Sequence, residues 1–344
     1  MIAELETFVK HGPKVVFVVD DNLIGNKKAI KLILREIIEW QRERGYPLIF
    51  STEASLDLAE DEELMVLMAE ANFHSVFVGI ESPNEESLME TKKYQNVRPQ
   101  AGSILDRVHK VQNYGLEIFC GMIMGFDHDD ADSFNTIPQF LKQAGIVQAL
   151  IGQLYAIPTT PLYARLAEEG RLDETEEDEY GTNVIPLKMT RQELRDGFVQ
   201  VMNEVYDVEA YFDRVDDIYI QRQFKYAAHH LSYWRNHRWA WFKQCVDRYA
   251  KFAFVFWKCM RTVPHKHLRK AYRRRLCGLM RAHPFEPHIW INYIQKVALH
   301  YHYHTMLESM SRGKFGAAGS VEEVSPYVSA ESTREPAFAD TQNV

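Results

Sequence analysis

The chain has 344 residues, 46% of them hydrophobic, which is enough for one large domain and an appended second one. Its formal net charge of −8 is that of a soluble protein, its N-terminal sequence is not that of a signal peptide, and no uncharged run reaches the roughly 18 residues of a membrane helix. The four cysteines form no CxxC or CxxxCxxC spacing, which argues against a disulfide framework and a local metal knuckle and favours a cytoplasmic location.

Five short apolar runs alternate with helical patterns in the first half of the chain. The runs predict strands at 15–19, 48–52, 75–80, 117–125 and 149–157, with helices between them at 30–38, 60–72, 100–114 and 130–145. Gly45 and Gly145 are expected to end the first and last of these helices. The strands are apolar on both faces and recur at the spacing of a βα unit. We therefore predict an α/β fold, a complete or partial parallel barrel over residues 1–185; a doubly wound sheet is the alternative.

The composition changes after the fifth run. Residues 168–183 are acidic and poor in apolar residues, which indicates a solvated linker. The sequence "TRQE" at 190–193 is a capping box that opens a helix. We expect an all-α C-terminal domain over 186–310 and a disordered tail over 311–344, where small and polar residues replace large apolar ones.

Polar side chains follow the expected strands at their carboxyl ends, where parallel α/β folds bind ligands. They include Asp20, Asp21, Asn22, Ser51, Glu53, Glu81 and Ser82. Carboxylates gathered at one rim repel one another unless a metal, a cationic ligand or shifted pKa values relieve them, so we predict a functional site there. For Asp20 and Asn22 the alternative is a cap on the following helix.

Two motifs at these ends contain glycine. In "VGIES" (78–82), Gly79 permits close approach of a ligand, and Glu81 can accept two hydrogen bonds, as a ribose diol or an ammonium group requires. In "GMIMGFD" (121–127), Gly121 and Gly125 leave a flat apolar surface suited to a planar ring.

In order, "FVVDDNLIGN", "FSTEASLDLA", "FVGIESPNEESL", "GMIMGFDHDD" and "LYAIPTTPLY" resemble strands two to six of the radical S-adenosylmethionine (SAM) barrel. The chain is most similar to the cobalamin-binding-domain type of that family, in which a helical C-terminal domain of unknown function (DUF4070-like) follows the barrel. The resemblance covers about residues 5–310. It implies a partial (β/α)6 barrel, a [4Fe-4S] cluster, reductive cleavage of SAM, and radical modification or methylation of a small-molecule or lipid substrate, with cobalamin held by a separate N-terminal domain.

The resemblance also implies roles for individual residues. Gly79 to Ser82 would lie along SAM, with Glu81 near its ribose or amino group. Gly121 to Gly125 would flank the adenine, as would the backbone at Leu154 and Tyr155. The residues expected to face SAM or the substrate are Asp20, Asp21, Asn22, Ser51 and Glu53.

The sequence departs from the family at the cluster. The CxxxCxxC loop that follows the family's first strand is absent, and Fe–S clusters need such thiolate ligands. We therefore expect a chain that is truncated at its N-terminus, lacks the first strand and is inactive alone. Two alternatives stay open. One is a barrel enzyme that holds a divalent ion on Asp20, Asp21, Glu53 and Glu81. The other is a non-catalytic remnant whose helical domain binds a membrane or a partner.

Residues 221–281 hold 16 Lys and Arg but only one acid, Asp247. This segment is either a solvated helical face or a surface for anionic lipid or an anionic substrate, which would make the protein peripheral to a membrane. Nucleic acid is disfavoured because no recognised binding motif is present, and the oligomeric state is open. Some relatives modify polyprenoid lipids such as hopanoids, which favours the membrane hypothesis. The sequence "HYHYH" spaces His300 and His304 as a metal pair would be, but we interpret them as ordinary histidines on a helix surface.

Overall fold

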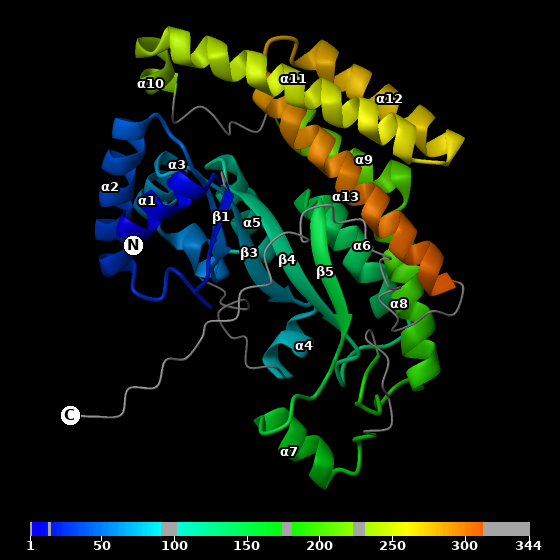
Figure 1. Cartoon of the computed structure of the whole chain (residues 1–344). Coiled ribbons are helices and arrows are strands. Elements are labelled where there is room, and N and C mark those ends of the chain that lie inside the picture. Colours follow the sequence, from blue (N-terminus) through cyan, green and yellow to red (C-terminus); the bar gives the residue numbers. More distant parts are fainter. Residues whose placement is uncertain (1, 13–14, 91–101, 174–180, 223–230, 312–344) are drawn as a thin grey trace, which may run out of the picture.

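The computed structural model describes residues 2–12, 15–90, 102–173, 181–222 and 231–311 (Figure 1). Its centre is one parallel sheet of five strands: β1 (Val15–Val18), β2 (Ile49–Glu53), β3 (Phe73–Glu81), β4 (Glu117–Met124) and β5 (Gln148–Gln153). Each strand pairs with the next one along the chain, in the order β1-β2-β3-β4-β5. A doubly wound sheet reverses its strand order at a switch point, so this order confirms the α/β prediction in its partial-barrel form.

Helices connect the strands and cover one face of the sheet. They are α1 (Ile2–His11), α2 (Lys27–Arg44), the 3-10 helix η1 (Leu56–Glu60), α3 (Glu62–Glu70), α4 (Glu85–Glu90), α5 (Ile104–Asn113) and α6 (Ser133–Ala144). Gly45 and Gly145 end α2 and α6 with φ of 71° and 64°, as predicted, because glycine adopts left-handed backbone without a Cβ clash. Asn26 caps α2 by accepting a hydrogen bond from the backbone N–H of Ala29, so the alternative role of Asp20 or Asn22 as a helix cap is wrong.

The two faces of the sheet differ in burial. Side chains that point toward the helices, such as Phe50, Val78 and Cys120, are at most 2% exposed. The alternate positions point to the other side, which we call the inner face; it comprises Phe17, Ser51, Glu53, Phe77, Gly79, Glu81, Phe119, Gly121, Ile123 and Leu150. Phe17 and Leu150 are 48% and 59% exposed, so the inner face is open at both edges.

A helical region follows β5. It consists of α7 (Pro161–Glu168), α8 (Arg191–Val205), α9 (Val208–Asp216), the π-helix η3 (Asp217–Gln221), α10 (Leu231–Asn236), α11 (Arg238–Thr262), α12 (Lys266–Ala282) and α13 (Pro287–Ser311). The capping box at Thr190 and Glu193 opens α8 as predicted. In Figure 1, α11 and α12 lie at the end of the molecule opposite to the one toward which β4 and β5 point. The predicted tail over 311–344 lies, beyond Ser311, outside the described residues.

Buried polar contacts join the sheet to the helical region. The ammonium of Lys296 on α13 lies 2.5 Å from the carboxylate of Glu117 at the start of β4, and the Tyr219 hydroxyl donates to the same carboxylate. The Lys296 and Glu117 side chains are 13% and 8% exposed. Little water screens this pair, so it fixes α13 against β4.

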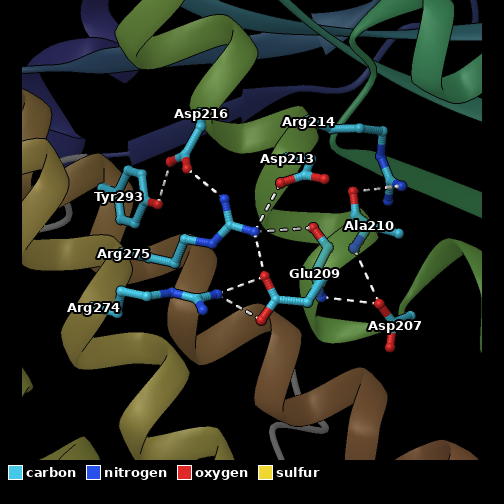
Figure 2. A network of polar contacts seen from close by, with 9 residues as sticks. All are labelled: Asp207, Glu209, Ala210, Asp213, Arg214, Asp216, Arg274, Arg275 and Tyr293. Carbon is cyan, nitrogen blue, oxygen red and sulfur yellow. Dashed lines mark hydrogen bonds and ion pairs between the residues drawn. The ribbon is translucent and has the colours of Figure 1, made fainter.

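The basic segment is partly neutralised within the helical region (Figure 2). Arg275 on α12 donates to Glu209, Asp213 and Asp216, all on α9. The neighbouring Arg274 donates to both carboxylate oxygens of Glu209. Two of the basic residues that the sequence offered to an anionic surface therefore bind α12 to α9 instead.

The expected linker at 168–183 packs, in its described part, against the segment that follows β5. Leu172 forms an antiparallel bridge with Val184, and Thr182 and Asn183 are each 2% exposed. The side-chain amide of Asn183 donates to the carbonyl of Ala156 and accepts from its N–H. The prediction of a solvated linker is thus wrong for these residues. It rested on the acidic composition of the segment, which does not show that Thr182 and Asn183 are buried. Residues 174–180 lie outside the described part.

Candidate functional site

Three successive levels of residues lie on the inner face toward the carboxyl ends of β3 and β4. Phe77 and Phe119 are register partners, and their rings meet edge to face with centroids 4.9 Å apart. Gly79 and Gly121 are the next pair. Glu81 follows at the end of β3. An aromatic base, a floor without side chains and a carboxylate therefore stand in sequence along one face.

The floor formed by Gly79 and Gly121 depends on the absence of a Cβ atom at Gly121. A Cβ at Gly121 would lie 3.1 Å from Cζ of Phe77, closer than nearly all real Cβ contacts. Glycine at this position leaves Phe77 in place and keeps the floor flat. A flat apolar floor of this kind suits a planar ring.

Glu81 has a backbone conformation that is unusual for its residue type. Its φ is 69°, in the left-handed region, and the register between β3 and β4 shifts at this point, where Glu81 pairs with Met122. The carboxylate turns back over the floor, so that Oε2 is 3.9 Å from the position of a Cβ on Gly121. Strained backbone of this kind concentrates at binding sites, because there it aims a side chain.

The remaining acids stand at the ends of β1 and β2. Glu53 is half-buried on the inner face, and its register partner is Phe77. Asp20 and Asp21 are exposed, and Asp20 accepts a hydrogen bond from the backbone N–H of Asn22. The amide of Asn22 in turn accepts from the N–H of Ser55, which ties the loop after β1 to the loop after β2.

The structure brings together some of the sequence-predicted residues. Ser51, Glu53, Gly79, Glu81 and Gly121 share the inner face, and Asp20, Asp21 and Asn22 follow β1 at the same rim.

The other four residues lie apart from the floor. Ser82 is buried and lines a cavity of about 250 Å³ with Ile123 at the end of β4 and residues of α6. A Cβ on Gly125 would collide with Leu194 of α8 at 2.6 Å, so this glycine packs against the helical region. Leu154 is buried beyond the end of β5, and Tyr155 is exposed there.

Sequence reasoning missed Asp129, which shapes the loop after β4. Its carboxylate accepts hydrogen bonds from the backbone N–H groups of Gly125 and Phe126 and from the Ser87 hydroxyl. Burial raises the pKa of Asp129, and these hydrogen bonds oppose the shift. The available signal was an aspartate four residues after a strand-ending glycine, where its side chain can bond to nearby backbone.

Asp127, in the same loop, has a structural role. Burial favours its neutral form, but the guanidinium groups of Arg171 and Arg165 lie against it and hold its pKa below the usual value. These two ion pairs connect the loop after β4 to α7, through Arg165, and to the segment after α7, through Arg171.

The rim acids do not form a compact metal centre. In the described part of the chain, one group of three His, Cys, Asp or Glu residues brings its ligand atoms within 4.8 Å of one another, and it lies in the helical region. The divalent-metal alternative for Asp20, Asp21, Glu53 and Glu81 therefore has no geometric support.

The cysteines do not fit an iron–sulfur cluster either. Cys120 is buried in β4, where burial raises the pKa of its thiol and so disfavours the thiolate that binds iron. Cys245 and Cys259 lie on α11, and Cys277 lies on α12.

Fold and site together define a class: a partial parallel α/β barrel with a glycine floor and carboxylates at its carboxyl rim, followed by a helical domain. Comparisons with known proteins show what the chain is similar to. Residues 160–314 match DUF4070, a domain of unknown function. The chain is 42% identical over 218 residues to an uncharacterized methyltransferase of Synechocystis sp. and 36% identical over 217 residues to the hopanoid C-2 methylase of Rhodopseudomonas palustris.

These matches cover 62% and 63% of this chain but 40% of each relative, so the chain spans about two fifths of the curated relatives that it matches. A solved radical SAM methyltransferase, TsrM from Kitasatospora setae with cobalamin and a [4Fe-4S] cluster bound, aligns with a TM-score of 0.43 and 18% identity, over 57% of this chain and 40% of that one. Over the matched residues the chain is similar to these two methyltransferases.

Proposed function

We propose that the inner face binds SAM and that the protein acts in the radical SAM methylation of an apolar, lipid-like substrate. The observation that carries this proposal is the pairing of Gly79 with Gly121 beneath the Glu81 carboxylate. Adenine is planar and needs a floor without Cβ atoms, while the ammonium group and ribose hydroxyls of SAM need carboxylate acceptors. The two methyltransferase relatives support the same reaction class.

Each residue of the floor has a distinct task in this proposal. Gly79 and Gly121 let the ring approach the backbone, and Phe77 closes the space beneath it. Glu81 accepts hydrogen bonds from the ribose or the ammonium group, and Glu53 adds a second negative charge that favours the cationic sulfonium. Bound SAM supplies the methyl or deoxyadenosyl group in this family. The cobalamin and the [4Fe-4S] cluster of the family are not assigned to residues here, and the four cysteines do not form a ligand set for the cluster.

The apolar side chains around the rim support an apolar substrate. Phe17 and Leu150 are 48% and 59% exposed on the inner face, and Tyr155 and Ile157, which follow β5, are 51% and 63% exposed. Large apolar groups left in water near a polar site are typical of a ligand-binding surface. The relative whose name specifies a hopanoid supports a lipid in that place.

We also propose that α11 lies on an anionic membrane surface. Five large apolar side chains of this helix are exposed: Trp239 (68%), Phe242 (56%), Val246 (52%), Phe254 (60%) and Trp257 (54%). Their spacing keeps all five on one side of the helix, while Phe252 on the other side is buried against Trp290 of α13. We call this exposed side the α11 stripe.

Basic residues accompany the α11 stripe. The ammonium of Lys243 lies 5.7 Å from the ring centroid of Trp239, and the guanidinium of Arg261 lies 4.9 Å from that of Trp257. An apolar stripe with Trp and flanking cations is typical of helices that lie in the plane of a bilayer, and each cation contributes about 1 kcal/mol on an anionic surface. In the described part of the chain, no helix is both long and apolar enough to cross a bilayer.

SAM binding is tested by calorimetric titration of the purified chain with SAM and with S-adenosylhomocysteine. We expect saturable binding of both, with the sulfonium compound bound more tightly because of the two carboxylates. Glu53→Gln and Glu81→Gln should each reduce that preference. Equal affinity for both compounds in all three proteins would contradict the assigned role of the carboxylates.

Membrane docking is tested by co-sedimentation with phosphatidylcholine vesicles, with and without phosphatidylglycerol. We expect binding to the anionic vesicles only. The double variant Trp239→Ala/Trp257→Ala should lower it about tenfold or more, since each aromatic side chain contributes more than about 1 kcal/mol. Phe285→Ala is the matched control, because Phe285 is 85% exposed outside α11. Equal sedimentation with both vesicle types would refute docking. So would the finding that the unaltered chain is a dimer and the double variant a monomer, because the α11 stripe would then be a dimer interface.

A further inference from the structure

Two histidines and a glutamate converge where α12 begins and α13 nears its end. His265 is the residue before α12, and its side chain forms no capping hydrogen bond. His304 and Glu308 are one turn apart on α13, so they share a helix face. Oε1 of Glu308 lies 3.7 Å from Nε2 of His304 and 3.7 Å from Nε2 of His265. All three ligand atoms lie within 4.8 Å of one another.

The His304 ring places an unpartnered nitrogen at this group of residues. Its Nε2 is buried and has no hydrogen-bond partner among the described residues. A neutral imidazole presents a lone pair to a cation, which a protonated ring cannot do.

We propose that His265, His304 and Glu308 bind a divalent first-row transition ion such as Zn²⁺. Two imidazoles and one carboxylate are a ligand set of zinc sites that keep a position open. Ligand atoms on a tetrahedral ion are about 3.4 Å apart, so the two 3.7 Å separations must shorten by a few tenths of an ångström. The separation between the two histidines, which lies within 4.8 Å, must shorten by at most about 1.4 Å. The three side chains are 27%, 24% and 35% exposed, which leaves them free to make that adjustment.

The open side of the site faces a cavity of about 240 Å³, which His304 and Glu308 line together with His267, His300 and Asp207. The His267 ring centroid is 6.3 Å from that of His304, close enough for this ring to approach as a fourth ligand or to contact a bound water. The ion would join the start of α12 to the end of α13. This site is independent of SAM and of the membrane surface.

His300 lies next to the site but has another partner. The prediction of a surface histidine is wrong for it, because it is 1% exposed and its Nδ1 lies 2.6 Å from the Tyr272 hydroxyl. The helical spacing alone could not show that α12 covers this side of α13. The predicted pair of His300 and His304 is thus replaced by His304 with Glu308, one turn further along, and His265.

The test uses the full chain without a histidine tag, stripped of metal by a chelator. We expect it to bind one equivalent of Zn²⁺, to show the intense visible absorption of tetrahedral Co²⁺, and to melt at a higher temperature with Zn²⁺. His304→Gln and Glu308→Gln should each weaken Zn²⁺ binding by at least about 100-fold, since the loss of even an outer-sphere partner costs 10 to 100-fold. His302→Gln, exposed on the same helix, is the matched control and should bind as the unaltered chain does.

The metal-free melting temperature of each variant checks its fold. Glu308 lies near the N-terminus of α12, where a carboxylate is stabilising without any ion. If that is its only role, Glu308→Gln lowers the metal-free melting temperature while the chain binds no stoichiometric Zn²⁺. That result would overturn the proposal, and so would Zn²⁺ binding that survives both ligand substitutions unchanged.

Discussion

The carboxylate of Glu81 lies over Gly121, with Oε2 3.9 Å from the position that a Cβ would occupy, and the Glu81 backbone reaches this arrangement with a φ of 69°. A side chain in left-handed backbone costs about 1–2 kcal/mol, and glycine avoids that cost. We therefore expect Glu81→Gly to be more stable than Glu81→Ala by about 1 kcal/mol in urea unfolding. Both variants should lose affinity for SAM. If alanine is as stable as glycine here, the backbone is not strained.

The buried pair of Glu117 and Lys296 predicts a large effect on stability. Lys296→Met leaves the Glu117 carboxylate, 8% exposed, without its cation, and breaking such a pair costs about 3–5 kcal/mol. The double variant Glu117→Gln/Lys296→Met should recover a large part of that loss, because no charge is then buried alone. Urea unfolding of the two variants measures both effects.

An exposed ion pair provides the control for this comparison. Lys251 and Asp247 are 52% and 50% exposed on α11, so Lys251→Met should change the free energy of unfolding by less than about 1 kcal/mol. If Lys296→Met had an equally small effect, the sheet and the helical region would not depend on the buried contact.

His288 predicts a decline in stability below neutral pH. Burial lowers its pKa to about 4, and the nearby Arg248 and His283 act in the same direction while Glu286 opposes them. The folded pKa is below the usual 6.5, so the neutral ring stabilises the fold above that pH, and this stability is lost as the pH falls toward 4. From pH 6.5 to 5 the loss is roughly 1.5 kcal/mol.

The matched variant for this effect is His288→Leu, which cannot take up a proton. Its free energy of unfolding should be flatter than that of the unaltered chain between pH 6.5 and 5. Parallel curves would assign the pH dependence to other groups. The comparison is made by urea unfolding at each pH, with the difference between the two proteins as the measured quantity.

Local sequence patterns predicted the sheet because each strand carries its own signal. The runs at 15–19 and 48–52 are apolar and bounded by polar residues, and β1 and β2 lie within a residue of those bounds. The ends of α2 and α6 followed from Gly45 and Gly145, since left-handed backbone at a helix end favours glycine. The inner-face residues Gly79, Glu81 and Gly121 followed from the rule that parallel strands align their carboxyl ends.

Long-range contacts account for what the sequence did not reveal. The sequence placed Gly125 in the ligand floor. In the structure its lack of a Cβ makes room for Leu194 of α8, a residue distant from it in the sequence. Asn183 lay in an acidic stretch and is nonetheless buried against Ala156. No local pattern showed that His265 would meet His304 and Glu308, because only the packing of α12 on α13 places them together.

The central claim is that SAM lies on the floor formed by Gly79 and Gly121. The most direct test is the affinity of the chain for SAM before and after Gly121→Val, whose Cβ would lie 3.1 Å from Cζ of Phe77 and whose methyl groups would rise from the floor. Gly278→Ala on α12 is the control, since a Cβ there meets nothing within 4 Å. We predict saturable SAM binding that Gly121→Val abolishes and Gly278→Ala preserves, with both variants folded by circular dichroism. Unchanged binding in folded Gly121→Val, or no saturable binding by the unaltered chain, would contradict the claim.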